Sequence, residues 1–123
     1  MIKKSFRAYN TIDSIILPSS LQEVKSNAFY GSNIDEVVFI GAVSLGHSAF
    51  SDSKIKSITL PVGSTLGMYV FCGCSQLETI RYGGTVQQWR ELIQIPKYGY
   101  NSADYAELNK ATVVCFDETI SPE

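Results

Sequence analysis

The sequence predicts a β-rich solenoid in which short strands stack in parallel, irregular segments return the chain, and a helix-containing cap closes the C-terminal end. Three observations predict this fold. Apolar residues recur at a fixed interval, they alternate within each unit as strand residues do, and proline or glycine follows the alternation. The chain has 123 residues, of which 45% are hydrophobic and 18% charged, and these values are typical of one packed domain.

The repeating unit is 21 or 22 residues long. Phe29, Phe50 and Phe71 follow one another at intervals of 21 residues. Further columns of apolar residues keep the same interval to within one residue: Ile12, Ile34, Ile55 and Leu77; Ile15, Val37, Ile58 and Ile80; Leu17, Phe39, Leu60 and Tyr82; and Val24, Leu45 and Leu66. Such a period indicates stacked repeats, because one unit of this size cannot bury its own apolar face.

Each unit is expected to contain one short strand. In the first, from Ile12 to Leu17, the last two apolar positions alternate as inward-facing strand residues do. Pro18 and Pro61 follow their strands, and Gly83 takes the same place in the last unit, so the chain leaves the sheet there. We expect neighbouring strands to pair in parallel about 4.8 Å apart, with the three phenylalanines in one buried column.

A helix is predicted directly after the last repeat. Thr85 and Gln88 fit a capping box, and the apolar residues that follow share one helical face: Val86, Trp89, Leu92 and Ile93. We expect Trp89 to cover the last unit as a core residue rather than to form a platform for a cation or ligand. Beyond it, a short helix is predicted from Ser102, a strand from Thr112 to Phe116, and a loose tail over 117–123.

The predicted domain, 1–123, has four parts: a partial repeat (1–11), the repeats (12–82), the cap (83–116) and the tail (117–123). Phe6 lies six residues before Ile12, as Phe71 lies six before Leu77, so the chain begins inside a repeat. An uncovered first unit exposes an apolar cross-section and an unpaired strand edge. We therefore expect either that the chain is a piece of a longer array or that another chain covers this end by self-association.

The chemically reactive side chains do not form a recognisable site. A single residue separates Cys72 from Cys74, which strains a disulfide, and with Cys115 and His47 these residues lack the paired spacing of zinc ligands. His47 stands where other units have serine or methionine, which is typical of a solvated connector. We therefore predict no catalytic residue, no metal and no cofactor, and we do not expect an enzyme.

Charge and hydropathy exclude two classes of partner. The formal net charge is -2 with no basic stripe, so a nucleic-acid partner is not expected. No stretch approaches the roughly 18 apolar residues of a spanning helix, and the basic start is not followed by an apolar segment. Neither membrane insertion nor a signal peptide is therefore predicted for this chain.

The outer face of the predicted sheet is the candidate binding site, because a repeat array offers there one side chain from every unit. The outward-facing residues are Ser14, Ile16, Glu36, Val38, Ile40, Ser57, Thr59, Thr79 and Arg81. Ile16, Val38 and Ile40 are expected to form an apolar patch. That patch is either a contact site or a consequence of the suitability of β-branched residues for strands.

The units resemble the BspA-type leucine-rich repeats of bacterial surface proteins. The resemblance lies in Leu60-Pro61, Ala28-Phe29, Ala49-Phe50 and the run Val70–Leu77, in which Cys74 takes the family's cysteine position. Ile40 departs from the pattern, since proline is usual at its place. The segment Tyr82–Arg90, followed by Ala111–Cys115, resembles the module that closes many of these arrays.

The resemblance implies a leucine-rich-repeat solenoid that acts as a non-enzymatic binding module. Its parent would be a bacterial cell-surface or secreted protein with a role in adhesion. The implied partner is a protein or a glycan, such as a host extracellular protein. The alternative is a structural spacer or self-assembly element that has no distinct ligand.

Overall fold

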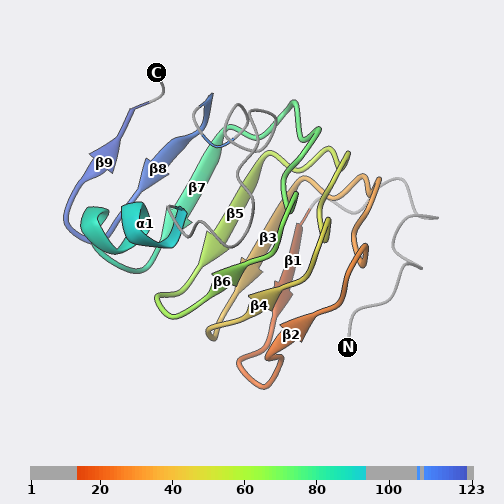
Figure 1. Ribbon diagram of the computed structural model, residues 1–123, viewed down its shortest axis with the longest axis horizontal. Coiled ribbons are helices and arrows are strands. Elements are labelled where there is room, and N and C mark those ends of the chain that lie inside the picture. The colour runs from red at the N-terminus through yellow and green to blue at the C-terminus, as the bar shows by residue number, and fades with distance from the viewer. Residues whose placement is uncertain (1–13, 94–107, 109, 122–123) are drawn as a thin grey trace.

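A computed structural model describes residues 14–93, 108 and 110–121 of the chain. Within these residues the strands lie in two sheets (Figure 1). Sheet A contains β1 (Ser14–Leu17), β3 (Glu36–Phe39), β5 (Ser57–Leu60), β7 (Thr79–Tyr82), β8 (Thr112–Val114) and β9 (Thr119–Ile120) in that order. Sheet B contains β2 (Glu23–Val24), β4 (Ser44–Leu45) and β6 (Thr65–Leu66), and the helix α1 spans Val86–Ile93.

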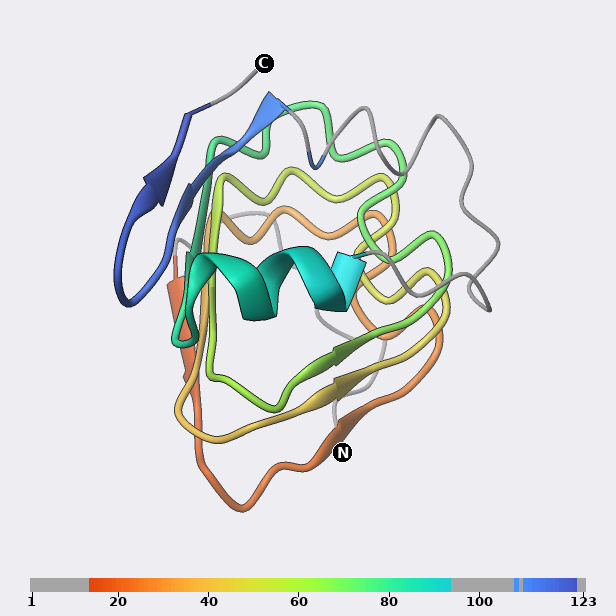
Figure 2. The ribbon, with the colours of Figure 1, turned by 60° about the vertical axis from the view of Figure 1, so that its left-hand side comes forward.

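The chain winds into a coil whose turns each contribute one strand to sheet A. Strands β1, β3, β5, β7 and β8 pair in parallel, and β9 then pairs antiparallel with β8. Figure 2 shows the cross-section of the coil, with sheet A along one side, sheet B along another, and turn segments closing the circuit. The predicted β-solenoid is confirmed.

The strand register confirms the apolar columns read from the sequence. Ile15 pairs with Val37, Val37 with Ile58, and Ile58 with Ile80, so this column runs straight across sheet A. The side chains of Val37, Ile58 and Ile80 are fully buried. The interval of the sequence repeat is therefore the length of one turn of the coil.

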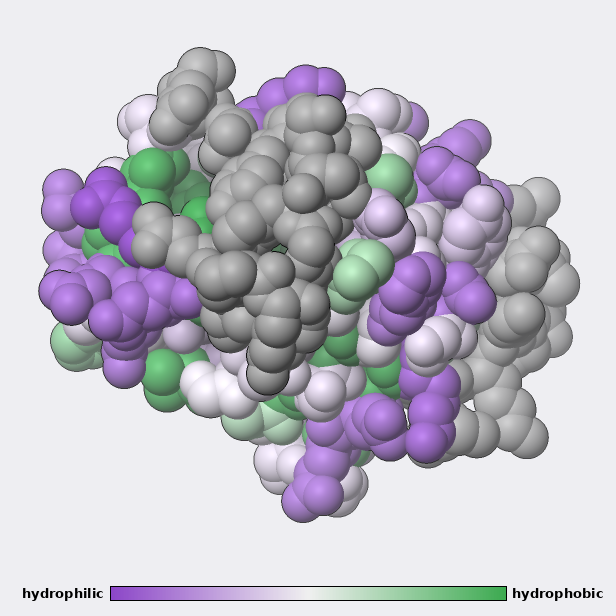
Figure 3. Space-filling view, viewed as in Figure 1, coloured by the Kyte–Doolittle hydropathy of each residue, from purple (hydrophilic) through white to green (hydrophobic). Residues whose placement is uncertain are grey.

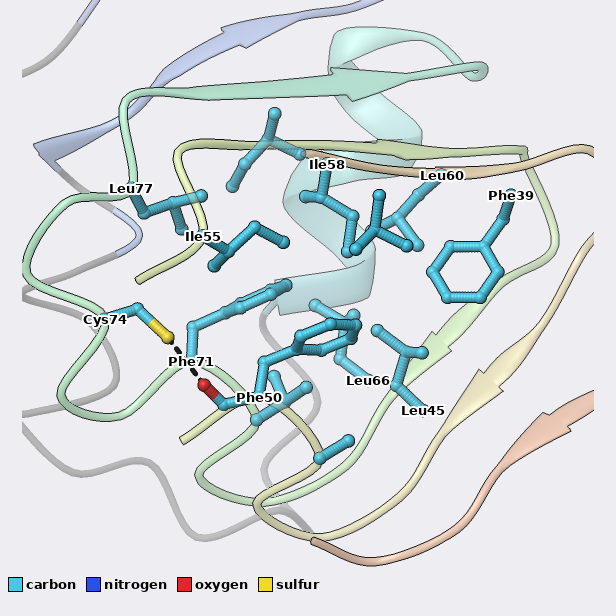
Figure 4. Packing of buried hydrophobic residues seen from close by; sticks show 14 of the residues in the cluster. Phe39, Leu45, Phe50, Ile55, Ile58, Leu60, Leu66, Phe71, Cys74 and Leu77 are labelled. Atoms are coloured by element: carbon cyan, nitrogen blue, oxygen red, sulfur yellow. Dashed lines mark hydrogen bonds between the residues drawn. The ribbon is translucent and has the colours of Figure 1, made fainter. Parts of the chain in front are cut away.

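The phenylalanine column is the centre of the core. Phe29, Phe50 and Phe71 are each 0% exposed. The ring centroids of Phe29 and Phe50 lie 4.8 Å apart with the planes 1° from parallel, and those of Phe50 and Phe71 lie 6.0 Å apart at 26°. Figure 4 shows the rings of Phe50 and Phe71 one above the other, between Ile55 and the β5 residue Ile58 on one side and the sheet B residues Leu45 and Leu66 on the other. The predicted buried column is confirmed.

The turns that carry these rings are tied to one another by backbone hydrogen bonds. The amide of Phe29 donates to the carbonyl of Ala49 at 2.8 Å, and the amide of Phe50 donates to the carbonyl of Val70 at 3.0 Å. Each turn reaches this geometry through left-handed backbone at equivalent positions, with φ 62°, 56° and 60° at Asn27, Ser48 and Tyr69. Because these segments bond from turn to turn, as strands do, the coil is held on the side opposite sheet A as well.

The return segments of the coil are more regular than the sequence predicted. The return segments were expected to be irregular, but those that follow β1, β3 and β5 each carry a second, two-residue strand. Val24, Leu45 and Leu66 stand in register and point inward, as predicted. These strands were missed because two residues are too short to show an alternation.

The helix closes the C-terminal end of the stack as expected. Thr85 and Gln88 form the predicted capping box: the Thr85 amide donates to Gln88 Oε1 at 2.8 Å, and the Gln88 amide donates to Thr85 Oγ1 at 3.1 Å. Trp89 is only 2% exposed, and its ring lies 5.4 Å from that of Tyr82 in the last repeat. Trp89 is therefore a core residue that covers the last unit.

Two expectations for the C-terminal region need correction. The predicted strand Thr112–Phe116 ends at Val114, and Phe116 is 83% exposed. Part of the predicted loose tail, Thr119–Ile120, forms β9 against β8. The partial repeat over 1–11, Ile12 and the short helix from Ser102 lie outside the described residues.

A candidate binding face on sheet A

The outward-facing positions of sheet A lie in two straight rows. The polar row consists of Ser14, Glu36, Ser57, Thr79 and Thr112, which pair in that order across the sheet. The mixed row consists of Ile16, Val38, Thr59, Arg81 and Val114, which pair in the same way. The structure thus brings the predicted outward-facing residues of four strands onto one surface, the outer face.

Alternating burial along the strands defines this face. In β3, Val37 and Phe39 are buried whereas Glu36 and Val38 are only half-buried. The strands β5 and β7 repeat the pattern. Alternation of this kind places one set of side chains in the core and the other set on the surface.

The chemistry of the outer face changes along the mixed row. At the β1 end Ile16 is 66% exposed, and Ile40, which follows β3 and lies next to the row, is 57% exposed. Ile40 is held beside β1 because its amide donates to the Leu17 carbonyl at 3.1 Å. Arg81 on β7, one strand before the row ends at Val114, has an exposed side chain. The face therefore has an apolar region on β1 and β3 and a cationic position on β7.

Sequence reasoning missed part of this face. Thr112 and Val114 extend the two rows by one strand, and Phe116 lies just beyond them in the turn between β8 and β9. These residues were assigned to the cap because they fall outside the repeat period. The alternation in Thr112–Val114 was the signal that could have found them, since it matches that of the preceding strands.

The outer face carries few charges. Within the described residues the ion pair is that between Lys25 Nζ and Glu23 Oε1, 3.0 Å apart and away from the outer face. Neither Glu36 nor Arg81 takes part in it. The guanidinium of Arg81 is thus a solvated cation on a largely uncharged surface.

The described part of the opposite side shows a different distribution of hydrophobic residues. In Figure 1 sheet B lies nearer the viewer than sheet A, so Figure 3 shows the side opposite the outer face. On the part of that side formed by described residues, hydrophobic residues appear as small separate areas among hydrophilic ones (Figure 3). That pattern is ordinary for a protein surface.

Two of the three thiols, those of Cys74 and Cys115, are buried and placed for packing rather than for chemistry. Cys74 is buried, and its Sγ donates to the Phe50 carbonyl at 2.8 Å (Figure 4). Ser32 and Ser53, which take the same place in the other turns, are also buried. Burial, followed by the nearby carboxylates of Asp117 and Glu118, raises the pKa of Cys115 despite Arg90, and this disfavours the reactive thiolate.

His47 is exposed in its turn, and its ring meets the edge of the Tyr69 ring at 5.4 Å. This exposure agrees with the connector role predicted for it. Among the residues the structure describes, no three His, Cys, Asp or Glu side chains lie close enough together to hold a metal ion.

A small hollow lies at the cap. It has a volume of about 120 Å³, and the described residues that line it are Trp89, Arg90, Ile93, Leu108, Ala111, Ile120 and Ser121. Pockets for small-molecule ligands generally measure about 300 Å³ or more. The outer face of sheet A is therefore the better candidate for recognition.

In the described part of the chain no helix has the length and hydrophobicity needed to cross a membrane. Comparison with curated proteins and with solved structures gives no significant match. Comparison with protein families gives one: the family described as "BspA type Leucine rich repeat region (6 copies)" matches residues 2–94. Leucine-rich repeats of this kind are typically binding or surface modules and are generally non-catalytic. The family match covers most of the chain, and together with the parallel coil and its phenylalanine column it shows that the chain belongs to the BspA-type leucine-rich repeat family.

Proposed function

We propose that the chain is a non-enzymatic protein-binding module that contacts its partner through the outer face of sheet A. One observation carries this proposal: Ile16 on β1 and Ile40, hydrogen-bonded to β1 directly after β3, are 66% and 57% exposed, and the aligned strands of the same sheet also present Arg81. Apolar side chains together with arginine are the usual anchors of protein interfaces. Such side chains gain buried apolar area only when a partner covers them.

A protein partner fits this face better than a glycan. The exposed apolar residues are aliphatic, so they offer contacts to other aliphatic or aromatic side chains. The polar row and the mixed row contain no aromatic residue on which a sugar ring could stack. By family resemblance, the parent protein is proposed to be a bacterial surface or secreted protein that takes part in adhesion.

The size of the face sets the expected affinity. Five parallel strands span about 19 Å, and four-residue strands are about 13 Å long. This area is well below the roughly 800 Å² per partner of a standard interface. Binding by this face alone is therefore expected to be weak and transient, in the micromolar range.

The proposal is tested by binding to a panel of purified extracellular-matrix and serum proteins, measured by biolayer interferometry up to high micromolar concentrations. The double variant Ile16→Thr/Val38→Thr should lose the interactions of the wild-type chain. The matched control is Val62→Thr, which changes an exposed apolar residue outside the strands of sheet A and should bind as the wild type does. Binding by the double variant equal to that of the wild type would overturn the proposal.

Sedimentation equilibrium of the same proteins tests the rival role of a self-assembly element. The proposal predicts a wild-type chain that binds panel members without forming oligomers. Self-association of the wild type that disappears in the double variant, with no binding to the panel, would establish the assembly role instead.

A further inference from the structure

The mixed row fixes the separation of Ile16 and Arg81 on the outer face. Ile16 pairs with Val38, Val38 with Thr59, and Thr59 with Arg81. Three strand spacings therefore separate Ile16 from Arg81, which is a distance of about 14 Å. Because all these residues belong to hydrogen-bonded strands, this separation is a fixed property of the face.

Arg81 is placed to receive an anion. Its neighbours in the row, Thr59 and Val114, carry no charge, and the neighbouring polar row offers the hydroxyls of Thr79 and Thr112. The ion pair found within the described residues lies elsewhere, between Lys25 and Glu23. A guanidinium offers paired N–H donors that match a carboxylate, and hydroxyls beside it can donate to the same group.

The apolar region of the face disfavours an anion. Glu36 lies two residues from Val38 on the same strand, so both project from the same face, and Val38 pairs with Ile16. A partner carboxylate there would meet Glu36 and lose hydration against aliphatic side chains. An aliphatic side chain would instead bury itself between Ile16, Val38 and Ile40.

We propose that the partner segment is an extended acidic peptide that sets a carboxylate on Arg81 and an aliphatic side chain between Ile16, Val38 and Ile40. An extended chain advances about 3.3 Å per residue, so a span of about 14 Å corresponds to about four residues. Residues i and i+4 of such a chain also point to the same side. The recognised pattern is thus an acidic residue and an aliphatic residue four positions apart. This inference rests on the proposed function of the outer face.

The test uses two synthetic peptides in a serine–threonine background, one with glutamate and leucine four positions apart and one with glutamine in place of the glutamate. Fluorescence anisotropy of labelled peptide measures the dissociation constants. The wild-type chain should bind the glutamate peptide about tenfold or more tightly than the glutamine peptide. Arg81→Glu should abolish this preference. Arg90→Glu makes the same substitution at an exposed position of α1, and this variant should keep the preference for the glutamate peptide.

The possible results separate the inference from the proposed function. Weaker binding of both peptides to Ile16→Thr/Val38→Thr, with no effect of Arg81→Glu on the preference, would support the binding face and overturn the acidic partner. A preference for glutamate that persists in Arg81→Glu would overturn the inference as well. Absence of wild-type binding both to these peptides and to a displayed library of random dodecapeptides would overturn the inference, and absence of binding to the protein panel as well would overturn the proposed function.

Discussion

The ring of Phe50 stacks on the ring of Phe29 with a centroid separation of 4.8 Å and an angle of 1° between the planes. The two residues are 21 positions apart in the sequence and occupy the same place in successive turns. On its other side Phe50 meets Phe71. Three successive turns thus each contribute one ring to this column, and the column supports sheet A from the inside.

Phe50→Ala should remove the middle ring and leave a cavity that the backbone-bonded turns cannot close. We expect the free energy of unfolding to fall by about 3–5 kcal/mol, measured from urea denaturation. Phe116→Ala is the matched control, because it deletes the same side chain at a position that is 83% exposed. Equal midpoints for Phe50→Ala and the wild type would show that the column does not stabilise the fold.

Gly46→Ala should force two turns of the coil apart. A Cβ at Gly46 would lie 2.7 Å from the Ser26 amide nitrogen and 2.8 Å from the Val24 carbonyl oxygen. Such crowding between adjacent turns should cost about 1–3 kcal/mol in the same assay.

Gly31 provides the contrast, because a Cβ there meets nothing within 4 Å but the backbone has φ +69°. Gly31→Ala should cost about 1–2 kcal/mol, and Gly31→Asn should cost less, since asparagine tolerates this conformation. Gly46→Asn should bring no such relief. A rescue of Gly46 by asparagine would contradict the close approach of the turns.

Asp117→Ala should remove a hydrogen bond between the turn that follows β8 and the start of α1. Asp117 Oδ1 accepts a hydrogen bond from the Val86 amide at 3.0 Å, so it satisfies a free N–H group in the first turn of α1. Its loss should cost about 1 kcal/mol, observed through the fluorescence of Trp89, the single tryptophan of the chain. Glu118→Ala removes the adjacent carboxylate, which makes no such bond to the helix, and should leave the transition nearly unchanged. Equal effects of the two substitutions would refute the role of Asp117.

The stability of the fold should decline in alkaline solution. Burial raises the pKa of Cys115 above its ordinary 9.0 and that of Tyr82 above its ordinary 10.0. The folded chain therefore holds these protons more tightly than the unfolded chain. Its stability is undiminished below about pH 9 and falls as the pH rises from the ordinary values toward the raised ones.

Cys115→Ala should make this decline shallower between about pH 9 and 10, because the thiol is the group that begins to titrate there. The measurement is the slope of unfolding free energy against pH, which is independent of any constant loss of stability that the substitution causes. An unchanged slope would show that Cys115 makes no such contribution.

Most of the fold could be predicted because the same pattern of inward-facing apolar residues recurs in each unit. Val37, Ile58 and Ile80 each occupy the inward position of a strand, and the register confirms all of them. The strands of sheet B could not be predicted, because a pair such as Glu23–Val24 is too short to alternate. The strand Thr119–Ile120 was also missed, since its pairing with β8 is antiparallel and lies outside the repeat.

The candidate site was predictable in position but not in chemistry. Alternation alone placed Ile16, Val38 and Arg81 on the outer face. The straight row that joins them depends on the register of three strand pairs, which no single strand encodes. Phe116 was expected inside a strand, and its exposure follows from the turn that begins after Val114.

A double-mutant cycle on Phe29 and Phe50 tests most directly whether the repeats hold one another through the aromatic column. We predict that the unfolding free energies of Phe29→Leu, Phe50→Leu and the double variant yield a coupling of about 0.5–1.5 kcal/mol. The same cycle on Phe29 and Phe71, which are separated by the ring of Phe50, should be additive to within about 0.5 kcal/mol. Additivity of Phe29 and Phe50 as well would contradict the account, because the turns would then be stabilised independently of one another.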